Sequence, residues 1–276
     1  MRADLHIHSY YSDGKISPAY IAETCVKNGV ELAVLTDHDN VNGCGEFAEE
    51  CKKRGVKFTV GLEISAYDGD VKIHTLGYNM DIGCDAYKKF EKFVYDGSVE
   101  RMEEVIYKLK KIGYSLTLQE ISAERYCEKS PFHIMYAAFA AAKKGYAASG
   151  PEFYADYLAP GKAAFSSAGR PTPEYALEVI QKSGGVSSLA HPGRITLSKD
   201  GVIKLVERMT SCGLNGIEAV YSGHTIGETA YYKEIAAKYS LLVTGGSDTH
   251  YSFGGRSIGE PEFYPSQELL SALKIV

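Results

Sequence analysis

The segment ADLHIHSYYSDG, residues 3–14, places His6 and His8 at the end of a short apolar run near the start of the chain. In a β-strand, residues i and i+2 point to the same side, so the two imidazoles are expected to project together. Neutral imidazole is a common metal ligand. A lone His-x-His pair is equally compatible with two structural histidines at a strand end, so the interpretation depends on the rest of the chain.

Apolar runs and helical patterns alternate along most of the sequence. Further strands are predicted at residues 31–39, 56–65, 71–79, 186–192, 216–222 and 241–246, and amphipathic helices such as PAYIAETCVKNG (18–29) and CGEFAEECKKRG (44–55) separate many of them. This order predicts an α/β fold with a mostly parallel sheet. About seven strands, most followed by a helix, favour a (β/α) barrel with fewer than eight units.

The middle of the chain departs from this order. Strand patterns fade from about residue 86 to residue 164, where FEKFVYDGSVERMEEVIYKLKKIG (90–113) and PFHIMYAAFAAAKKG (131–145) predict helices. We therefore expect a helical insertion domain at residues 91–165. The barrel domain would then be discontinuous, formed by residues 1–90 and 166–276, and the insertion has the size of a small domain.

Composition limits the classes of function. The formal net charge is −5 and the pI is about 5.9, which argues against a long groove for polymeric nucleic acid. The six cysteines form no CxxC pair, so reduced thiols are expected. The sequence has neither a signal-peptide pattern nor an apolar run long enough to cross a bilayer. We therefore predict a cytoplasmic protein without a membrane partner. A monomer is also predicted, because the sequence contains no extended heptad repeat.

Metal-ligand residue types recur where the predicted strands end. They are His6 and His8, Asp37, His38 and Asp39, Glu63, His74, His191, and Asp248 and His250. In (β/α) barrels the active site lies at the carboxyl ends of the strands. Repetition at six strand ends makes a purely structural role improbable, so a metal site is predicted.

The ordered segments HIHSYYSDG, LTDHD, GLEIS, KIHTLGY, AHPGR and GSDTH resemble the motifs of the PHP (polymerase and histidinol phosphatase) family of metal-dependent phosphoesterases. The resemblance spans residues 4–250. It implies a distorted (β/α)7 TIM-like barrel with two to three divalent ions (Mn, Fe or Zn). It assigns His6, His8, Glu63 and Asp248 to one ion, Glu63, His74 and His191 to a second, and Asp13, His38 and His250 to a third. Some relatives have histidine in place of Asp13, and a carboxylate there favours Mn²⁺ or Fe²⁺ over Zn²⁺.

The resemblance also implies a reaction. A hydroxide bridging two ions would hydrolyse a phosphate ester of a small nucleotide-type substrate, a nucleoside monophosphate or a nucleotide bisphosphate. Asp248 or His250 would protonate the leaving oxygen. Arg194 would bind phosphate, and His224 would bind phosphate or protonate the leaving group. Asp37 or Asp39 is expected to orient the imidazole of His38.

The insertion is expected to contribute to substrate binding through His133 and Lys162. Relatives often have Arg-Pro-His-Ile where this chain has Pro131-Phe132-His133-Ile134. The missing arginine weakens the case for a 3′,5′-bisphosphate, unless Arg125 or Lys129 replaces it. Arg170 is expected to be a hinge or solvent residue.

Three alternatives stay open. They are a 5′→3′ exonuclease on short oligonucleotides, a histidinol-phosphate phosphatase, and a non-catalytic module like those attached to some polymerases. The insertion argues against the histidinol-phosphate phosphatase, and the complete ligand set argues against the non-catalytic module.

Overall fold

The computed structural model describes residues 1–251 and 256–275. The strands are β1 (Ala3–Ile7), β2 (Leu32–Leu35), β3 (Lys57–Phe58), β4 (Gly61–Asp68), β5 (Val71–Tyr78), β6 (Val186–Leu189), β7 (Gly216–Tyr221) and β8 (Leu242–Gly246). The helices are α1 (Pro18–Lys27), α2 (Cys44–Arg54), α3 (Asp85–Lys111), α4 (Leu118–Ser122), α5 (Ile134–Lys143), α6 (Gly150–Phe153), α7 (Pro173–Lys182), α8 (Lys199–Ser211), α9 (Ile226–Lys238) and α10 (Gln267–Ala272). Two short helical segments, η1 (Tyr154–Leu158) and η2 (Pro192–Arg194), complete the order.

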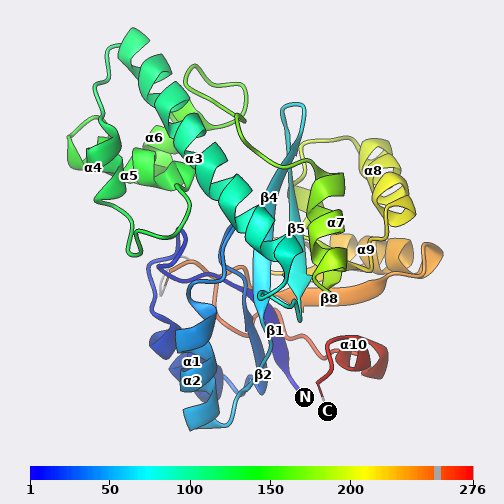
Figure 1. The fold of residues 1–276 in the computed structure, drawn as a ribbon. Coiled ribbons are helices and arrows are strands. Elements are labelled where there is room, and N and C mark those ends of the chain that lie inside the picture. The colour runs from blue at the N-terminus through cyan, green and yellow to red at the C-terminus, as the bar shows by residue number, and fades with distance from the viewer. Residues whose placement is uncertain (252–255, 276) are drawn as a thin grey trace.

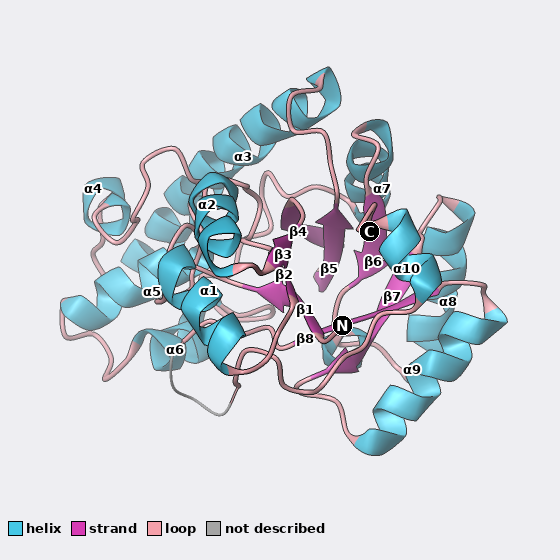
Figure 2. Ribbon diagram, turned by 90° about the horizontal axis from the view of Figure 1, so that it is seen from below, coloured by secondary structure: helices cyan, strands magenta, loops and turns pink. Residues whose placement is uncertain are grey.

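The strands form two sheets surrounded by helices, which confirms the predicted mixed α/β fold. One sheet has the order β1-β2-β3 and the other β4-β5-β6-β7-β8. Figure 2 shows the strands at the centre, with α1 and α2 on one side and α8 and α9 on the other. The single strand predicted at residues 56–65 is divided in two, because β3 pairs with β2 in the first sheet and β4 pairs with β5 in the second.

Strand β5 is the exception to the parallel arrangement. It runs antiparallel to both β4 and β6, whereas the other paired strands are parallel. Asp68 pairs with Val71, so the β4–β5 connection is the two-residue turn Gly69–Asp70, with Gly69 at φ 58°. A two-residue turn joins antiparallel neighbours and a positive φ suits glycine. The hairpin formed by β4 and β5 projects well beyond the rest of the sheet (Figure 1).

Backbone hydrogen bonds join the two sheets at both ends. Between β1 and β8, the amide of Asp248 donates to the carbonyl of His6 at 2.7 Å, and the amide of His8 donates to Thr249 at 3.0 Å. Between β2 and β4, the amide of Glu63 donates to Asp37 at 3.2 Å, and the amide of Asp39 donates to Glu63 at 2.9 Å. The segments that carry the predicted ligands are thus held in register with one another.

Helix α3 connects two hydrophobic clusters. Its first half, including Phe90 and Val94, packs with residues of β4 and α7. Its second half, including Met102 and Val105, packs in a separate cluster that extends to Ala164 and includes α5 and α6. Figure 1 shows α3 running from the sheet to the group α4–α6. Within the described residues, no helix is long and apolar enough to span a membrane.

A close approach of two glycines fixes the middle of α3. A Cβ atom added to Gly97 would lie 2.3 Å from the carbonyl oxygen of Gly169, which is shorter than real contacts allow. Gly169 has φ 63° and immediately precedes Arg170, at the point where the chain returns to the sheet. Glycine at both positions lets the helix contact the returning chain backbone to backbone.

Candidate metal centre

Four donor atoms surround one point near the ends of β1 and β8. His6 Nε2 lies 3.1 Å from His8 Nε2, 3.3 Å from Glu63 Oε2 and 3.5 Å from Asp248 Oδ1. His8 Nε2 lies 3.1 Å from Glu63 Oε2 and 3.3 Å from Asp248 Oδ1. Five of the six distances among these four atoms therefore measure 3.1–3.5 Å. An ion between three atoms with such spacing, as in the group His6, His8 and Asp248, can lie about 2.0 Å from each, which is the length of a zinc–nitrogen or zinc–oxygen bond.

The other oxygen of Glu63 belongs to a second group. Glu63 Oε1 lies 2.6 Å from His74 Nδ1 and 3.0 Å from His191 Nε2, and these two nitrogens are 3.3 Å apart. Glu63 is near the beginning of β4, His74 is on β5, and His191 follows β6. One carboxylate thus faces two sets of histidines, and each set can hold one ion.

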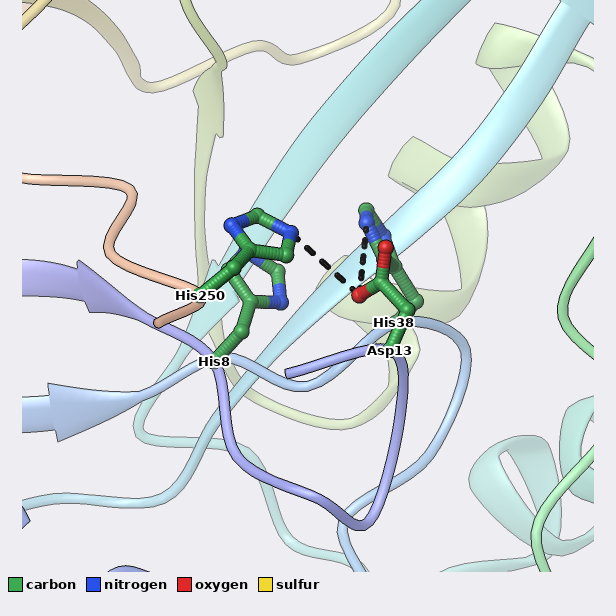
Figure 3. Close-up of side chains that lie close together, drawn as sticks. All are labelled: His8, Asp13, His38 and His250. Atoms are coloured by element: carbon green, nitrogen blue, oxygen red, sulfur yellow. Dashed lines mark ion pairs between the residues drawn. The ribbon is translucent and has the colours of Figure 1, made fainter. Parts of the chain in front are cut away.

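The third group contains His8, Asp13, His38 and His250 (Figure 3). Asp13 Oδ1 is 3.2 Å from His250 Nε2 and 3.8 Å from His38 Nε2. The donor atoms of His8, Asp13, His38 and His250 all lie within 4.8 Å of one another, as one shared ion requires. The structure therefore brings together all three ligand groups that the resemblance implies.

Asp37 holds the loop that carries Asp13. Its carboxylate accepts hydrogen bonds from the amide of Ser9 at 2.8 Å, the hydroxyl of Ser9 at 2.7 Å and the hydroxyl of Ser12 at 2.6 Å. Gly14 follows where the loop folds back on itself, and a Cβ atom there would lie 2.7 Å from the carbonyl oxygen of Ser9. These bonds turn the chain after β1 so that Asp13 faces His38 and His250.

Asp39 supports the centre from the other side. Its Oδ1 accepts the amide of Ser65 at 2.8 Å and its Oδ2 pairs with Arg170 Nη1 at 2.5 Å. The expectation that Arg170 is a hinge or solvent residue is therefore wrong, because its side chain is 5% exposed. The expectation that Asp37 or Asp39 orients His38 is also wrong, since His38 Nδ1 lies near the Ser65 hydroxyl (3.3 Å) and Glu63 (3.1 Å).

Burial and charge shape the titration of the centre. Burial opposes ionisation of Asp13, Glu63 and Asp248, but the surrounding histidines hold the pKa of each carboxyl well below its usual range. Burial likewise opposes charge on His6, whereas Glu218, Glu63 and Asp248 raise its pKa well above the usual value. The carboxylates are thus ionised at neutral pH, the state in which they bind cations.

The positions of the donor atoms suit bound metal ions better than they suit hydrogen bonds among the side chains. Glu63 Oε2 is buried within 3.3 Å of His6, His8 and His38 nitrogens, yet it forms no hydrogen bond within the described residues. Asp13 Oδ1, which faces nitrogens of His250 and His38, is also buried without a hydrogen-bond partner there. Buried polar atoms are normally paired, so a cluster whose atoms converge without pairing is suited to divalent cations.

Glu218 is a member of the centre that the sequence interpretation missed. This fully buried residue of β7 accepts a hydrogen bond from His6 Nδ1 at 2.9 Å and another from the amide of His191 at 2.7 Å. A proton on Nδ1 would leave Nε2 free to bind an ion placed among the donor atoms of Glu63, His8 and Asp248. Such outer carboxylates fix the tautomer and the orientation of ligating histidines.

A cavity of about 560 Å³ opens above the three groups. Its lining combines ligand residues with cations and with residues of the helical segment, including Lys72, His133, Met135, Tyr154, Pro160, Arg194 and Arg256. Arg194 Nη1 donates to Asp248 Oδ2 at 3.2 Å and to the Tyr221 hydroxyl at 3.1 Å, while 55% of its side chain stays exposed. Arg256 Nη1 donates to Asp248 Oδ2 at 2.6 Å.

The remaining residues that were predicted to bind substrate differ in whether they line the cavity. His133 lines the cavity, with Nδ1 3.5 Å from Asp13 Oδ2 and its ring stacked on His38. His224 and Lys162 are not among the described residues that line it. His224 Nδ1 donates to the carbonyl of Ala219 on β7 at 3.1 Å, and its Nε2 accepts the amide of Gly193, in the loop after His191, at 3.2 Å. Lys162 is exposed at the surface.

Comparisons with known proteins agree with this geometry. A family model described as the PHP domain matches residues 4–158, more than half of the chain. A phosphoribosyl 1,2-cyclic phosphate 1,2-diphosphodiesterase from Eggerthella lenta is 30% identical over 266 residues, covering 92% of this chain and 96% of the relative. A 3′,5′-nucleoside bisphosphate phosphatase from Chromobacterium violaceum is 29% identical over 265 residues, covering 95% and 92%.

A solved structure supports the fold. A protein from Bifidobacterium adolescentis superposes with a TM-score of 0.86 at 24% identity, covering 99% of this chain and 96% of that one. A mixed α/β fold that gathers this donor set beneath a cavity defines a metal-dependent phosphoester hydrolase. The chain belongs to the PHP domain family, as its ordered motifs predict.

Proposed function

We propose that the chain hydrolyses a phosphate ester of a small nucleotide-type substrate, using two to three Mn, Fe or Zn ions. The observation that carries the proposal is the spacing of His6 Nε2, His8 Nε2, Glu63 Oε2 and Asp248 Oδ1, which matches the corners of one metal coordination sphere. The groups around His74 and around Asp13 would hold the other ions. Bound divalent ions would polarise phosphoryl oxygens and lower the pKa of water.

The chain's own cations would orient the substrate. The exposed part of the Arg194 guanidinium borders the cavity, while its Nη1 is fixed by Asp248 and Tyr221. A guanidinium held in this way is suited to bind two oxygens of one phosphate. His250 would hold an ion through Nε2, because its Nδ1 already donates to the carbonyl of Asp248 at 3.0 Å.

The cavity supports a substrate of nucleotide size. Its volume of about 560 Å³ lies within the usual range for small-molecule sites. We propose that residues 91–165 act as a substrate cap on a distorted (β/α)7 barrel formed by residues 1–90 and 166–276. Support comes from the separate hydrophobic cluster of the helical segment and from its contribution of His133, Met135 and Tyr154 to the cavity lining.

The test is a phosphate-release screen with added Mn²⁺ over adenosine monophosphate, adenosine 3′,5′-bisphosphate, a dinucleotide and histidinol phosphate. We expect release from a nucleotide by the wild-type protein and none by Asp248→Asn, which should keep its circular dichroism spectrum. Asp70→Asn, the same change in the exposed hairpin turn, is the matched control. Activity that survives Asp248→Asn, or a wild-type protein that releases phosphate from no nucleotide, would refute the proposal.

A second candidate is cleavage of a phosphodiester. It is favoured by the 30% identity with a diphosphodiesterase over nearly its whole length, and it includes the short-oligonucleotide exonuclease of the sequence interpretation. Chromatography of the dinucleotide reaction separates the two candidates. Nucleoside monophosphate as the product indicates a diesterase, and inorganic phosphate indicates a phosphatase.

A further inference from the structure

Lys72 is a cation of the cavity that the proposed reaction does not use. It lies on β5 two residues before His74, so both side chains point to the same face of the strand. Lys72 pairs with Tyr67 on β4, whereas His74 pairs with Ser65. Lys72 is therefore two residues, or about 7 Å, closer to the hairpin turn than His74. Its side chain lines the cavity.

The ammonium group of Lys72 has no fixed counter-ion. Across residues 1–251 and 256–275, its side chain makes no ion pair and no hydrogen bond, although it is only partly exposed. The charges of Arg170 and Arg194 oppose its own, and the carboxylates that favour it are Glu63 and Asp13. Those carboxylates are the proposed metal ligands, so bound ions would neutralise them and leave Lys72 unpaired. Burying an unpaired charge costs free energy, and an incoming anion would recover that cost.

The cations that the sequence favoured for this role are placed elsewhere. The guanidinium of Arg125 donates to the carbonyls of Glu128 and Ser130, each at 3.0 Å, and packs over the Phe132 ring. Arg125 and Lys129 line a separate surface hollow beside α3. Lys162 is exposed. Among the described residues, Lys72 is thus the lysine that borders the cavity containing the ligand groups.

We propose that Lys72 binds a second anionic group of the substrate and makes the enzyme selective for phosphoesters that carry one. The inference rests on the proposed function, which places the phosphate to be cleaved at the metal centre. A second phosphate attached through the sugar then reaches the Lys72 level of the hairpin. The ammonium acts there as a point charge with three donors.

The test compares Lys72→Met with the wild-type protein on adenosine 3′,5′-bisphosphate and on adenosine 5′-monophosphate. A hydrogen bond between charged groups corresponds to about 10- to 100-fold, so we expect kcat/KM for the bisphosphate to fall by that factor, mainly through KM. The value for the monophosphate should change by less than about threefold. Lys72→Arg should retain the preference, and Lys204→Met, the same loss of charge on the exposed face of α8, should change neither substrate.

Calorimetric titration of the metal-loaded proteins with non-hydrolysable analogues of the same two nucleotides, in which methylene groups replace the ester oxygens, gives a readout independent of turnover. Wild-type protein should bind the bisphosphate more tightly than the monophosphate, and Lys72→Met should abolish the difference. Equal losses on both substrates, no loss on either, or a selective loss in Lys162→Met instead would overturn the assignment. A wild-type protein that hydrolyses neither nucleotide but binds the bisphosphate through Lys72 would contradict the proposed function alone.

Discussion

Replacing Glu218 by glutamine tests how the centre is organised beyond its ligands. The carboxylate accepts two hydrogen bonds, one from His6 Nδ1 and one from the amide of His191, and it is fully buried. Glutamine offers one carbonyl oxygen and one NH₂ group. Either orientation of the amide therefore places a donor against one of the two donors that Glu218 now satisfies.

The magnitude follows from these two contacts. A buried donor left unsatisfied costs about 1–3 kcal/mol, so Glu218→Gln should lower the free energy of unfolding of the metal-free protein by that amount. Loss of an outer partner of a ligating histidine typically lowers metal affinity by about 10- to 100-fold. We expect this weakening for the ion held by His6, because Nδ1 of that imidazole would no longer be fixed as the protonated nitrogen.

The assay is a competition between the protein and a chromophoric chelator for Zn²⁺, with urea unfolding of the metal-free protein alongside. Glu103→Gln, on the exposed side of α3, is the matched control and should leave both quantities unchanged. A Glu218→Gln protein that is destabilised but binds every ion within twofold of the wild-type affinity would refute the reasoning. Glu218 would then support the fold without orienting His6.

Three further predictions concern ion pairs, protons and stoichiometry. Arg170→Ala breaks the buried pair with Asp39 and should lower the free energy of unfolding, measured in urea, by about 3–5 kcal/mol. Arg208→Ala breaks an exposed pair with Asp68 and should lower it by less than about 1 kcal/mol. Equal losses would contradict the role of burial. Chelation should lower the melting temperature, by more at pH 9 than at pH 7. Burial lowers the pKa of His8, but Asp248 and Glu63 raise it to about 9. Protonation of His8 therefore stabilises the metal-free fold fully below pH 6.5, and this stabilisation is lost as the pH rises through 9. A difference that shrinks with pH would oppose this competition between proton and metal. Asp13→Ala should remove one ion per chain by elemental analysis, and loss of every ion would show that the groups are not separate.

The ligand residues could be placed from the sequence because strand geometry is regular. His6 and His8 share a side through the two-residue period of a strand, and polar residues at strand ends are expected to meet at one edge. Both arguments need only local sequence. The division of these residues among three ions came from the resemblance, and the structure brings the members of each predicted group close together.

The residues that were missed depend on long-range packing. Glu218 stands inside the apolar strand GIEAVY, and a charged residue at such a position must have a partner, but the partners His6 and His191 are remote in sequence. Arg170 likewise finds Asp39 across 131 positions. A charge in an apolar run was the available signal for Glu218, whereas the sequence around Arg170 contained none.

The sequence interpretation also missed the direction of β5. The Gly69–Asp70 turn is a recognisable hairpin signal, yet the alternation of strands and helices favoured parallel pairing. With β5 antiparallel, the inward residue before His74 lies farther out in the cavity instead of beneath the centre. Because of that reversal Lys72 borders the cavity, whereas the resemblance indicated the insertion as the source of a second cation.

The continuity of α3 has a practical consequence for exchanging parts between relatives. The helix is 27 residues long, about 40 Å, and contributes to both hydrophobic clusters. A chimaera joined at residue 91 would cut the helix within its first turns and separate Phe90 from Val94. Transplanting the segment from Cys84 to Gly169 keeps α3 whole and its contact with Gly169 intact, but it places Phe90 and Val94 against the β4 and α7 surfaces of the recipient. A working exchange therefore has to match the apolar residues of β4 and α7 to the incoming helix, while Lys72 on β5 stays with the recipient.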